Sequence, residues 1–155
     1  MYADSFEVGE KTGWLVFSKD GLHSLHLPKK RATQPPRTTL RKHKLTQNLK
    51  AYFEGQKVGF NAKIDWDPYS GFQREVLEKC RLVAYGQTKS YQHLARTIKR
   101  PAASRAVGNA LAKNRLPIVI PCHRIVRSDG KLGGFSNSQY TKGELLDLEG
   151  NGRHK

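Results

Sequence analysis

Apolar and polar positions alternate with two different periods in the first part of the chain. In residues 13–27, "GWLVFSKDGLHSLHL", two alternating runs flank the segment 19–21, whose Asp-Gly pair is a strong signal for a hairpin turn. Residues 45–56, "LTQNLKAYFEGQ", instead place their apolar side chains at helical spacing and stop at Gly55. This part of the sequence therefore predicts a β-hairpin followed by a helix.

The pattern becomes helical after a turn-rich stretch. We place a boundary at residues 65–71, "DWDPYSG", and predict two subdomains, residues 1–67 and 68–155. The next segment, 71–83, puts five apolar side chains on one helical face: Phe72, Val76, Leu77, Cys80 and Val83. Cysteine in such a position behaves as a small apolar residue, so we interpret Cys80 as part of the core.

Two further helical segments are separated by a short break. Ser90 is placed to cap a helix over "YQHLARTIK", and Arg100-Pro101 ends it before a second helix in residues 102–114. The residues expected to face inward in the second helix are Ala103, Ala106, Val107, Ala110 and Leu111, and the outer face carries Arg105, Gly108, Asn109 and Ala112. Glycine at an exposed helical position costs about 1 kcal/mol relative to alanine, so Gly108 indicates the close approach of another surface. The pattern predicts a helix-turn-helix.

Charge then indicates a class of partner. The chain has 28 Lys+Arg against 13 Asp+Glu, a net charge of +15. Residues 79–128 contain no acidic residue but eleven Lys or Arg. A solvated surface normally mixes signs, so an acid-free segment that includes the predicted helix-turn-helix favours a phosphate backbone as partner. A second basic run, 28–44, is Pro-rich, and we interpret it as a loop that serves as a solvated connector.

The segment 116–124, "LPIVIPCHR", carries the candidate chemistry. Its β-branched run and Pro121 predict an extended segment that holds Cys122 in a fixed place. Two cysteines supply neither a disulfide framework nor the paired ligands of a structural zinc site. Cys122 is therefore either a reactive thiol or a buried core residue. If His123 is its base, a turn or a bridging water must connect the two, because neighbours in an extended chain point to opposite sides.

An imidazole that acts as a base also needs a group that orients it. The acid-free segment offers none, so the remaining carboxylates are Asp129, Glu144, Asp147 and Glu149. A cysteine hydrolase would use the same residue types, but that interpretation leaves the basic segment unexplained. A metal held by Cys122 and His123 is not expected, because no further ligands cluster near them in the sequence.

Four motifs, in order and at the right spacing, carry a resemblance to a known family. They are "YGQTKSYQHLA", "ASRAVGNALAKN", "IPCHRIVRSDGKLGGFS" and "LLDLEG". Across residues 72–150 the chain resembles the O6-alkylguanine-DNA alkyltransferases, also called methylated-DNA–protein-cysteine methyltransferases, whereas residues 1–67 resemble them only in outline. The resemblance implies an α+β fold, in which a small N-terminal α/β subdomain with a short antiparallel sheet packs on a mostly helical, winged-helix-like C-terminal subdomain with the helix-turn-helix.

The resemblance implies DNA repair by direct reversal in a single-turnover enzyme. The damaged base is flipped out of the duplex, and the alkyl group of O6-alkylguanine moves irreversibly to a cysteine of the protein, with O4-alkylthymine as a further candidate substrate. The implied catalytic residues are Cys122 as alkyl acceptor, His123 as a base acting through water, Glu149 as its orienting acid, Asn114 as a hinge and Tyr91 as proton donor to guanine N3. No cofactor and no metal are implied.

The same resemblance implies how DNA is bound. The implied base pocket consists of Leu111, the Ile125 carbonyl, Phe135 and the Ser136 backbone N–H. The implied DNA contacts are Gln92, Ala103, Ser104, Arg105, Gly108, Ala112, Arg124 and Ser128, with Arg105 entering the base stack in place of the flipped nucleotide. The second helix would lie in the minor groove of double-stranded DNA that contains O6-alkylguanine.

Two other classes of DNA-binding protein stay open at this point. A non-transferring relative that only recognises the lesion would characteristically lack the acceptor cysteine, which this chain has. A regulator that senses alkylation would need a further region. We expect a monomer, with cooperative binding to DNA left open. No window approaches 18 consecutive apolar residues, and the acidic start "MYADSFEVGEK" is unlike a secretory signal. We therefore expect no membrane association and an intracellular place, in the cytoplasm or nucleoid, or in the nucleus of a eukaryote.

Overall fold

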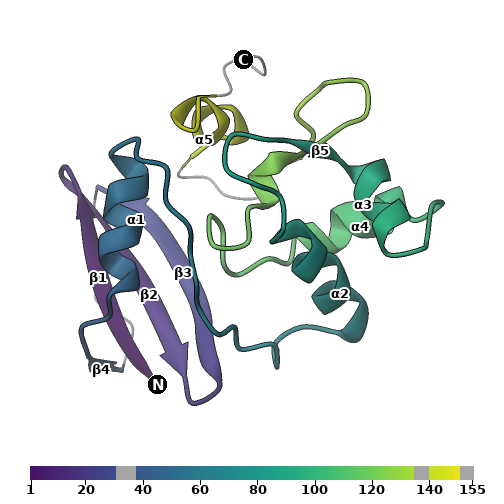
Figure 1. The fold of residues 1–155 in the computed structure, drawn as a ribbon. Coiled ribbons are helices and arrows are strands. Elements are labelled where there is room, and N and C mark those ends of the chain that lie inside the picture. The colour runs from purple at the N-terminus through teal and green to yellow at the C-terminus, as the bar shows by residue number, and fades with distance from the viewer. Residues whose placement is uncertain (31–37, 135–139, 151–155) are drawn as a thin grey trace. The chain divides into compact units, whose positions relative to one another are not determined.

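The computed structural model describes residues 1–30, 38–134 and 140–150, which form an α+β fold, as predicted. The chain divides into two compact units, Met1–Pro68 (unit 1) and Tyr69–Lys155 (unit 2). Figure 1 shows the helices and strands of both units, and each unit contains buried apolar residues. None of the helices in the described part of the chain is long and apolar enough to cross a membrane.

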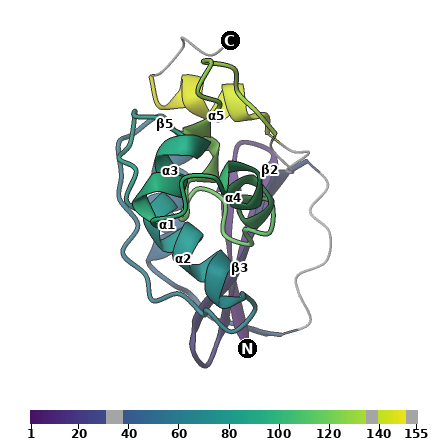
Figure 2. The ribbon, with the colours of Figure 1, turned by 90° about the vertical axis from the view of Figure 1, so that its right-hand side faces the viewer.

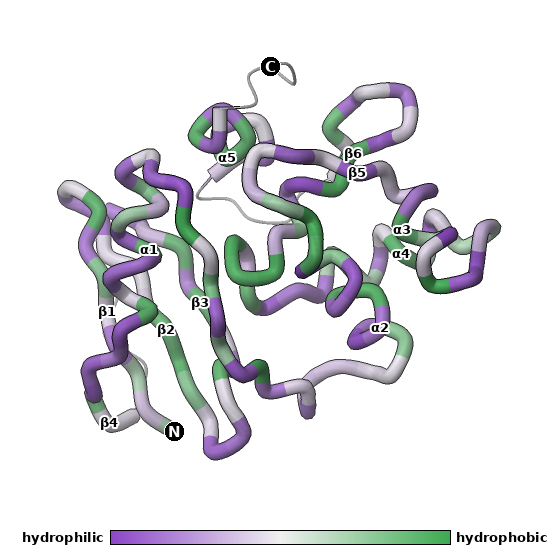
Figure 3. The backbone as a smooth tube through the Cα atoms, viewed as in Figure 1, coloured by the Kyte–Doolittle hydropathy of each residue, from purple (hydrophilic) through white to green (hydrophobic). Residues whose placement is uncertain are grey.

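Unit 1 is built on a four-stranded sheet with the order β3-β2-β1-β4. Its strands are β1 (Tyr2–Val8), β2 (Lys11–Ser18), β3 (Gly21–Lys29) and β4 (Thr39–Leu40). The antiparallel pair β2–β3 is the predicted hairpin, and β4 pairs with β1 in parallel. Figure 3 shows β2 as apolar over much of its length, in keeping with its central place in the sheet.

Two features of this sheet differ from the expectation. β1 was not predicted, because only Ala3 and Phe6 of its residues are buried apolar side chains and the alternation is therefore weak. The basic run 28–44 is not wholly a loop, since Pro28 and Lys29 end β3 and Thr39–Leu40 form β4. Residues 31–37 of that run lie outside the described part of the chain.

The predicted helix of unit 1 is α1 (Leu45–Phe53), which packs against β1. Its buried side chains, Leu45, Leu49 and Tyr52, recur at the helical spacing seen in the sequence. Gly55 follows the helix with a φ of +87°, a conformation that glycine adopts without a steric penalty. The local pattern thus determines both the helix and its end.

Unit 2 is mostly helical and contains the predicted helix pair. Its elements are α2 (Gly71–Cys80), β5 (Lys89–Ser90), α3 (Tyr91–Thr97), α4 (Ser104–Leu111), a 3-10 turn (Cys122–Arg124), β6 (Ile125–Val126) and α5 (Lys142–Leu148). The Ser90 side chain accepts a hydrogen bond from His93 N and caps α3, as predicted. Helices α3 and α4 pack against each other (Figures 1 and 2). Cys80 is fully buried, which confirms its place in the core.

Two residues of the predicted inner face of α4 are placed differently. Val107, Ala110 and Leu111 are buried, but Ala106 is exposed, and Ala103 is half-buried at the N-cap. The helix spans two turns only, so its buried stripe is narrower than the periodicity over the longer segment 102–114 suggested.

The prediction of an extended segment before Cys122 is wrong. Residues 116–121 are buried but form consecutive turns, with Ile118 at a φ of +73°. Ile120 N donates to Leu116 O at 2.8 Å, and Cys122 N donates to Ile120 O at 2.8 Å. Pro117 and Pro121 lack the N–H groups that a ladder of strand hydrogen bonds requires, so an apolar, β-branched run here folds back on itself.

Candidate active site

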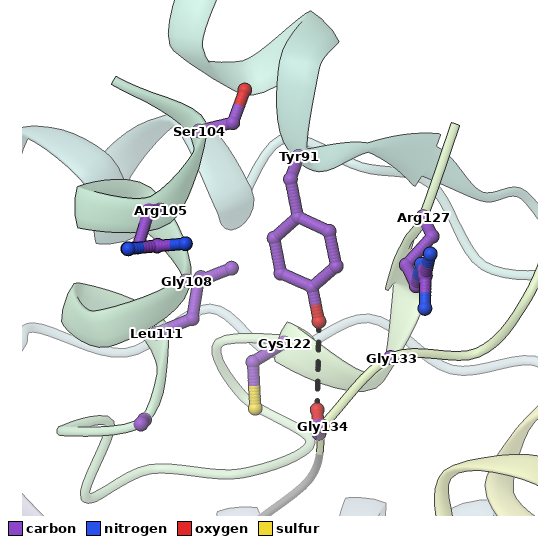
Figure 4. A pocket seen from close by; sticks show the side chains of 10 residues that line it. Tyr91, Ser104, Arg105, Gly108, Leu111, Cys122, Arg127, Gly133 and Gly134 are labelled. Carbon is purple, nitrogen blue, oxygen red and sulfur yellow. Dashed lines mark hydrogen bonds between the residues drawn. The ribbon is translucent and has the colours of Figure 1, made fainter. Parts of the chain in front are cut away.

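Unit 2 contains a cavity of about 850 Å³ between α3, α4 and the segment that follows β6. Its lining consists of Tyr91, Ser104, Arg105, Gly108, Leu111, Ala112, Cys122, Arg127, Gly133 and Gly134. Figure 4 shows the Cys122 sulfur and the Tyr91 ring inside this cavity, with Arg105, Gly108 and Leu111 on one side and Arg127 and Gly133 on the other. The cavity therefore joins a thiol, a phenol and the outer face of α4.

Cys122 begins the 3-10 turn and is partly exposed in the cavity. Burial raises the pKa of its thiol, while a hydrogen bond to Asn114 and the positive charge of Lys142 act in the opposite direction. The resting group is thus a thiol, and it becomes a nucleophile when a base removes its proton.

His123 and Glu149 form the buried pair that can supply this base. His123 Nε2 lies 2.5 Å from Glu149 Oε2, and both side chains are fully buried. Burial lowers the pKa of His123, although Glu149 acts to raise it, so the ring is a neutral acceptor near pH 7. Because an ionised carboxylate only accepts hydrogen bonds, Nε2 carries the ring proton and Nδ1 is the basic nitrogen.

The other three candidate carboxylates have different places. Asp129 Oδ2 lies 2.9 Å from Arg127 Nη2. Glu144 completes the capping box of α5 with Thr141, and Asp147 is exposed on the same helix. Of the four, Glu149 is the one whose side chain reaches His123.

Arg124 does not lie where a DNA contact would. We predicted that it meets DNA, but its side chain is buried, with Nε 2.8 Å and Nη2 3.1 Å from the two oxygens of Glu149. Its Nη1 donates to Val83 O at 2.8 Å. The 3-10 turn explains the difference, because it directs Arg124 toward α5 instead of the cavity. Arg124 holds Glu149 in place, and its buried side chain does not support the predicted contact with DNA.

Asn114 closes the loop that leads to Cys122. Its Nδ2 donates to Ile120 O at 2.8 Å, and its Oδ1 accepts from Leu116 N at 2.9 Å. A side chain that bonds both ends of a turn replaces the missing strand hydrogen bonds of this proline-containing segment. Asn114 therefore fixes the position of Cys122 relative to α4.

A buried lysine is the functional side chain that the sequence interpretation missed. Lys142 Nζ donates to Tyr91 Oη at 2.9 Å, to Leu132 O at 2.8 Å and to Gly134 O at 3.3 Å. Burial lowers the pKa of Lys142 to about 8. At the start of α5 in the motif "TKGELLDLEG" it reads as an exposed helix residue.

Gly133 is fitted closely against the same phenol. A Cβ at this position would lie 2.7 Å from Tyr91 Oη, and the backbone has a φ of +78°. A side chain would therefore both strain the backbone and displace the ring. Lys142, Tyr91 and the segment 132–134 together form what we call the phenol clamp.

Only some of the residues predicted to contact DNA or form the base pocket line the cavity. Ser104, Arg105, Gly108, Leu111 and Ala112 line the cavity, joined by Arg127, which was not predicted. Gln92 and Ser128 are exposed, Ala103 is half-buried, and none of these three is among the lining residues. Ile125 is fully buried and is not among the lining residues, so the contact of its carbonyl with a base stays a prediction. Phe135 and Ser136 lie outside the described residues.

The described residues contain one group of side chains close enough to share a metal ion. Asp20, Asp65 and Asp67 of unit 1 have carboxylate oxygens within 4.8 Å of one another. Asp65 already accepts hydrogen bonds from Ser18 Oγ at 2.6 Å and from Asp67 N at 3.0 Å. Asp65 is therefore already engaged in hydrogen bonds within unit 1.

Comparison with known proteins shows which family unit 2 resembles. Residues 71–151 match the family described as "6-O-methylguanine DNA methyltransferase, DNA binding domain". The methylated-DNA–protein-cysteine methyltransferase of Sulfolobus acidocaldarius is 43% identical over 99 residues, 64% of this chain and 61% of that protein. The protein of the same name from Methanosarcina acetivorans is 38% identical over 105 residues, 68% of this chain and 67% of its own.

The fold extends the likeness to nearly the whole chain. The structure of Mycobacterium tuberculosis OGT in complex with DNA matches with a TM-score of 0.82 at 29% identity, covering 99% of this chain and 95% of that one. The aligned region spans just under two thirds of the length of the Sulfolobus relative. With the family match covering more than half of its residues, this chain belongs to the 6-O-methylguanine DNA methyltransferase family.

Proposed function

We propose that this protein repairs DNA by moving the alkyl group from O6 of guanine to Cys122, once per molecule. The observation that carries the proposal is the position of Cys122. Its side chain lines a cavity, and the next residue, His123, is buried and paired with Glu149. The family supplies the reaction class, and the cavity supplies a place for a base that has left the duplex.

The reaction balances with groups of this chain alone. The Cys122 thiol gives its proton to His123 Nδ1 through a water, and the sulfur attacks the alkyl carbon. The new S–C bond forms as the C–O6 bond breaks, and the electron pair of that bond passes to the guanine. Glu149 stabilises the imidazolium that forms, because its carboxylate lies 2.5 Å from the other ring nitrogen.

The phenol clamp would supply the proton that the leaving guanine needs. A guanine anion leaves poorly, and a proton from Tyr91 to N3 turns it into a neutral base. The phenolate left on Tyr91 would then be stabilised by the Lys142 ammonium, which donates to its oxygen at 2.9 Å. Lys142 thus acts on the base through Tyr91.

The outer face of α4 suits the extrusion of a nucleotide. Arg105 is exposed at the cavity and can fill the space of a flipped base, while Gly108 and Ala112 allow the minor groove to approach closely. Gln92 and Ser128 are exposed and available to phosphates. A protein with this reaction would work where DNA is, in the cytoplasm or nucleoid or in a nucleus.

Mass spectrometry after incubation with a duplex that contains one O6-methylguanine tests the proposal. One methyl group on the Cys122 peptide per protein molecule, with guanine restored in the DNA, is the expected result. Cys122→Ala should bind the duplex and transfer nothing, whereas Cys80→Ala, the matched change at the buried cysteine, should still transfer. Tight binding without transfer by the wild type would identify a lesion-recognition protein instead.

A further inference from the structure

Unit 1 carries a basic segment that the proposed reaction does not use. Residues 21–53 contain no Asp or Glu and eight Lys or Arg. The sequence alone favoured a solvated connector for the central part of this stretch. The described residues 38–47, which we call the basic corner, instead form β4 and the start of α1. In Figure 3 the connection between these two elements is strongly hydrophilic, and Arg41, Lys42 and Lys44 in it are exposed.

The backbone of the basic corner is fixed to the first strand of the sheet. Arg41 N donates to Ala3 O at 2.8 Å, directly after the parallel pairing of β4 with β1. His43 N and Thr46 Oγ donate to Asp4 Oδ2 at 2.8 and 3.1 Å. These bonds lie on both sides of Lys42 and Lys44, so the two lysines are presented from an ordered backbone.

Side-chain stacking also holds the basic corner in place. The Arg41 guanidinium lies 5.1 Å from the centre of the Tyr2 ring. Tyr2 stacks on Phe17 with centroids 4.7 Å apart, and Phe17 stacks on His43 at 4.4 Å. A solvated connector would not be expected to use two aromatic side chains of the sheet for its own placement.

The surface of the corner is hollowed and carries net positive charge. A depression of about 440 Å³ is lined by Asp4, Ser5, Lys42, His43, Lys44, Thr46 and Gln47. Its one carboxylate is occupied inside the protein, because Asp4 accepts from Ser5 N at 2.9 Å as well as from His43 and Thr46. Lys42 and Lys44 are both exposed, and the depression has a single carboxylate against these two lysines.

We propose that the basic corner is a second nucleic-acid surface, which binds backbone phosphates without reading bases. Ordered cations and hydroxyl or amide groups are the side chains that contact phosphate in protein–DNA interfaces. Cations carried on an ordered backbone lose less conformational entropy on binding than those of a mobile tail. The inference rests on the proposed function in one respect, the choice of DNA as the polyanion.

The test is the salt dependence of binding to undamaged duplex DNA. The variant is Lys42→Ala/Lys44→Ala in the full chain, and its matched control is Lys57→Ala/Lys63→Ala, which removes two exposed lysines elsewhere in unit 1. The slope of log K against log[salt] should become shallower by about 0.9 for each phosphate that the variant no longer neutralises, so by roughly 1–2 for the corner variant. The control should keep the slope of the wild type.

Two further measurements make the outcome unambiguous. Binding is measured with DNA in excess, at concentrations for which native mass spectrometry confirms one protein per duplex. Transfer from a free O6-alkylguanine base is measured in parallel. Equal slopes for both variants, or a weakening that appears only with two or more proteins per duplex, would overturn the second surface. Both variants should transfer from the free base at the wild-type rate, because the corner lies outside the cavity of Cys122. Failure of the wild type itself to bind or transfer would instead overturn the proposed function.

Discussion

Unit 2 buries two cations close to its reactive groups, and the protein treats them in opposite ways. Arg124 is 6% exposed and meets both oxygens of Glu149. Lys142 is 3% exposed, and it donates to a phenol and two backbone carbonyls, all uncharged. Both charges act on His123. The difference in partners decides which of the two side chains keeps its positive charge at every pH.

Arg124 is suited to a role that needs a constant positive charge, and Lys142 to one in which the charge changes. A guanidinium stays protonated at any pH at which the protein is folded and matches a carboxylate with two parallel hydrogen bonds. An ammonium without a carboxylate partner is penalised by burial, which brings the pKa of Lys142 down to about 8. The cluster of His123, Arg124 and Glu149 therefore serves the structure and the base, whereas the phenol clamp can exchange a proton near neutral pH.

The largest effect is expected where the permanent charge pair is broken. Glu149→Gln leaves the Arg124 guanidinium buried without its counter-charge, and breaking a buried pair in this way costs about 3–5 kcal/mol. The free energy of unfolding, measured in urea, should fall by that amount. Transfer from a free O6-alkylguanine base should slow by about 100-fold or more, because the His123 imidazolium also loses its partner.

Asp147→Asn is the matched control, since this carboxylate is exposed on the same helix. Its stability should change by less than about 0.5 kcal/mol, and its transfer rate should stay at the wild-type value. A Glu149→Gln protein with wild-type stability would show that Arg124 does not depend on the carboxylate, and the contrast between the two cations would fail.

The two clusters also differ in how far the sequence could predict them. Residue types alone left Cys122 open between a reactive thiol and a core residue, and Glu149 as one of four carboxylates; the resemblance of the motifs to a known family singled these residues out. The helix pair over α3 and α4 follows from its periodicity and the Ser90 cap. The turn at residues 116–121 did not follow, because a buried β-branched run looks alike whether it is extended or folded back.

Lys142 shows the physical limit of the sequence interpretation. Two of its acceptors are backbone carbonyls, and the third, Tyr91, is 51 positions away in the chain. Backbone acceptors leave no mark in a residue pattern, since every residue has one. Arg124 was misplaced for a related reason: its neighbours are basic, but the carboxylate that buries it lies 25 positions further on.

A smaller effect is expected from a change in the walls of the phenol clamp. Gly133→Ala introduces a Cβ that would lie 2.7 Å from Tyr91 Oη, at a φ of +78°. Displacement of the phenol should slow transfer from the free base by about 10–100-fold, because proton donors act only within hydrogen-bond reach. Gly134→Ala is the matched neighbour, where a Cβ meets nothing within 4 Å. Equal rates for the two variants would show that the position of Tyr91 is not critical.

The smallest effect tests the proton of Lys142 itself. Because the pKa of Lys142 is lowered to about 8 from 10.5, transfer should slow a few-fold as the pH rises past 8 and the ammonium is lost. In the same range stability should rise with pH, since between 8 and 10.5 the unfolded chain binds a proton that the folded protein has released. Lys142→Met should remove both trends. The difference between the wild-type and variant pH profiles, for transfer rate and for stability, therefore isolates the contribution of Lys142. Identical profiles would mean that the lysine only positions the segment 132–134, and the two buried cations would then be alike in function.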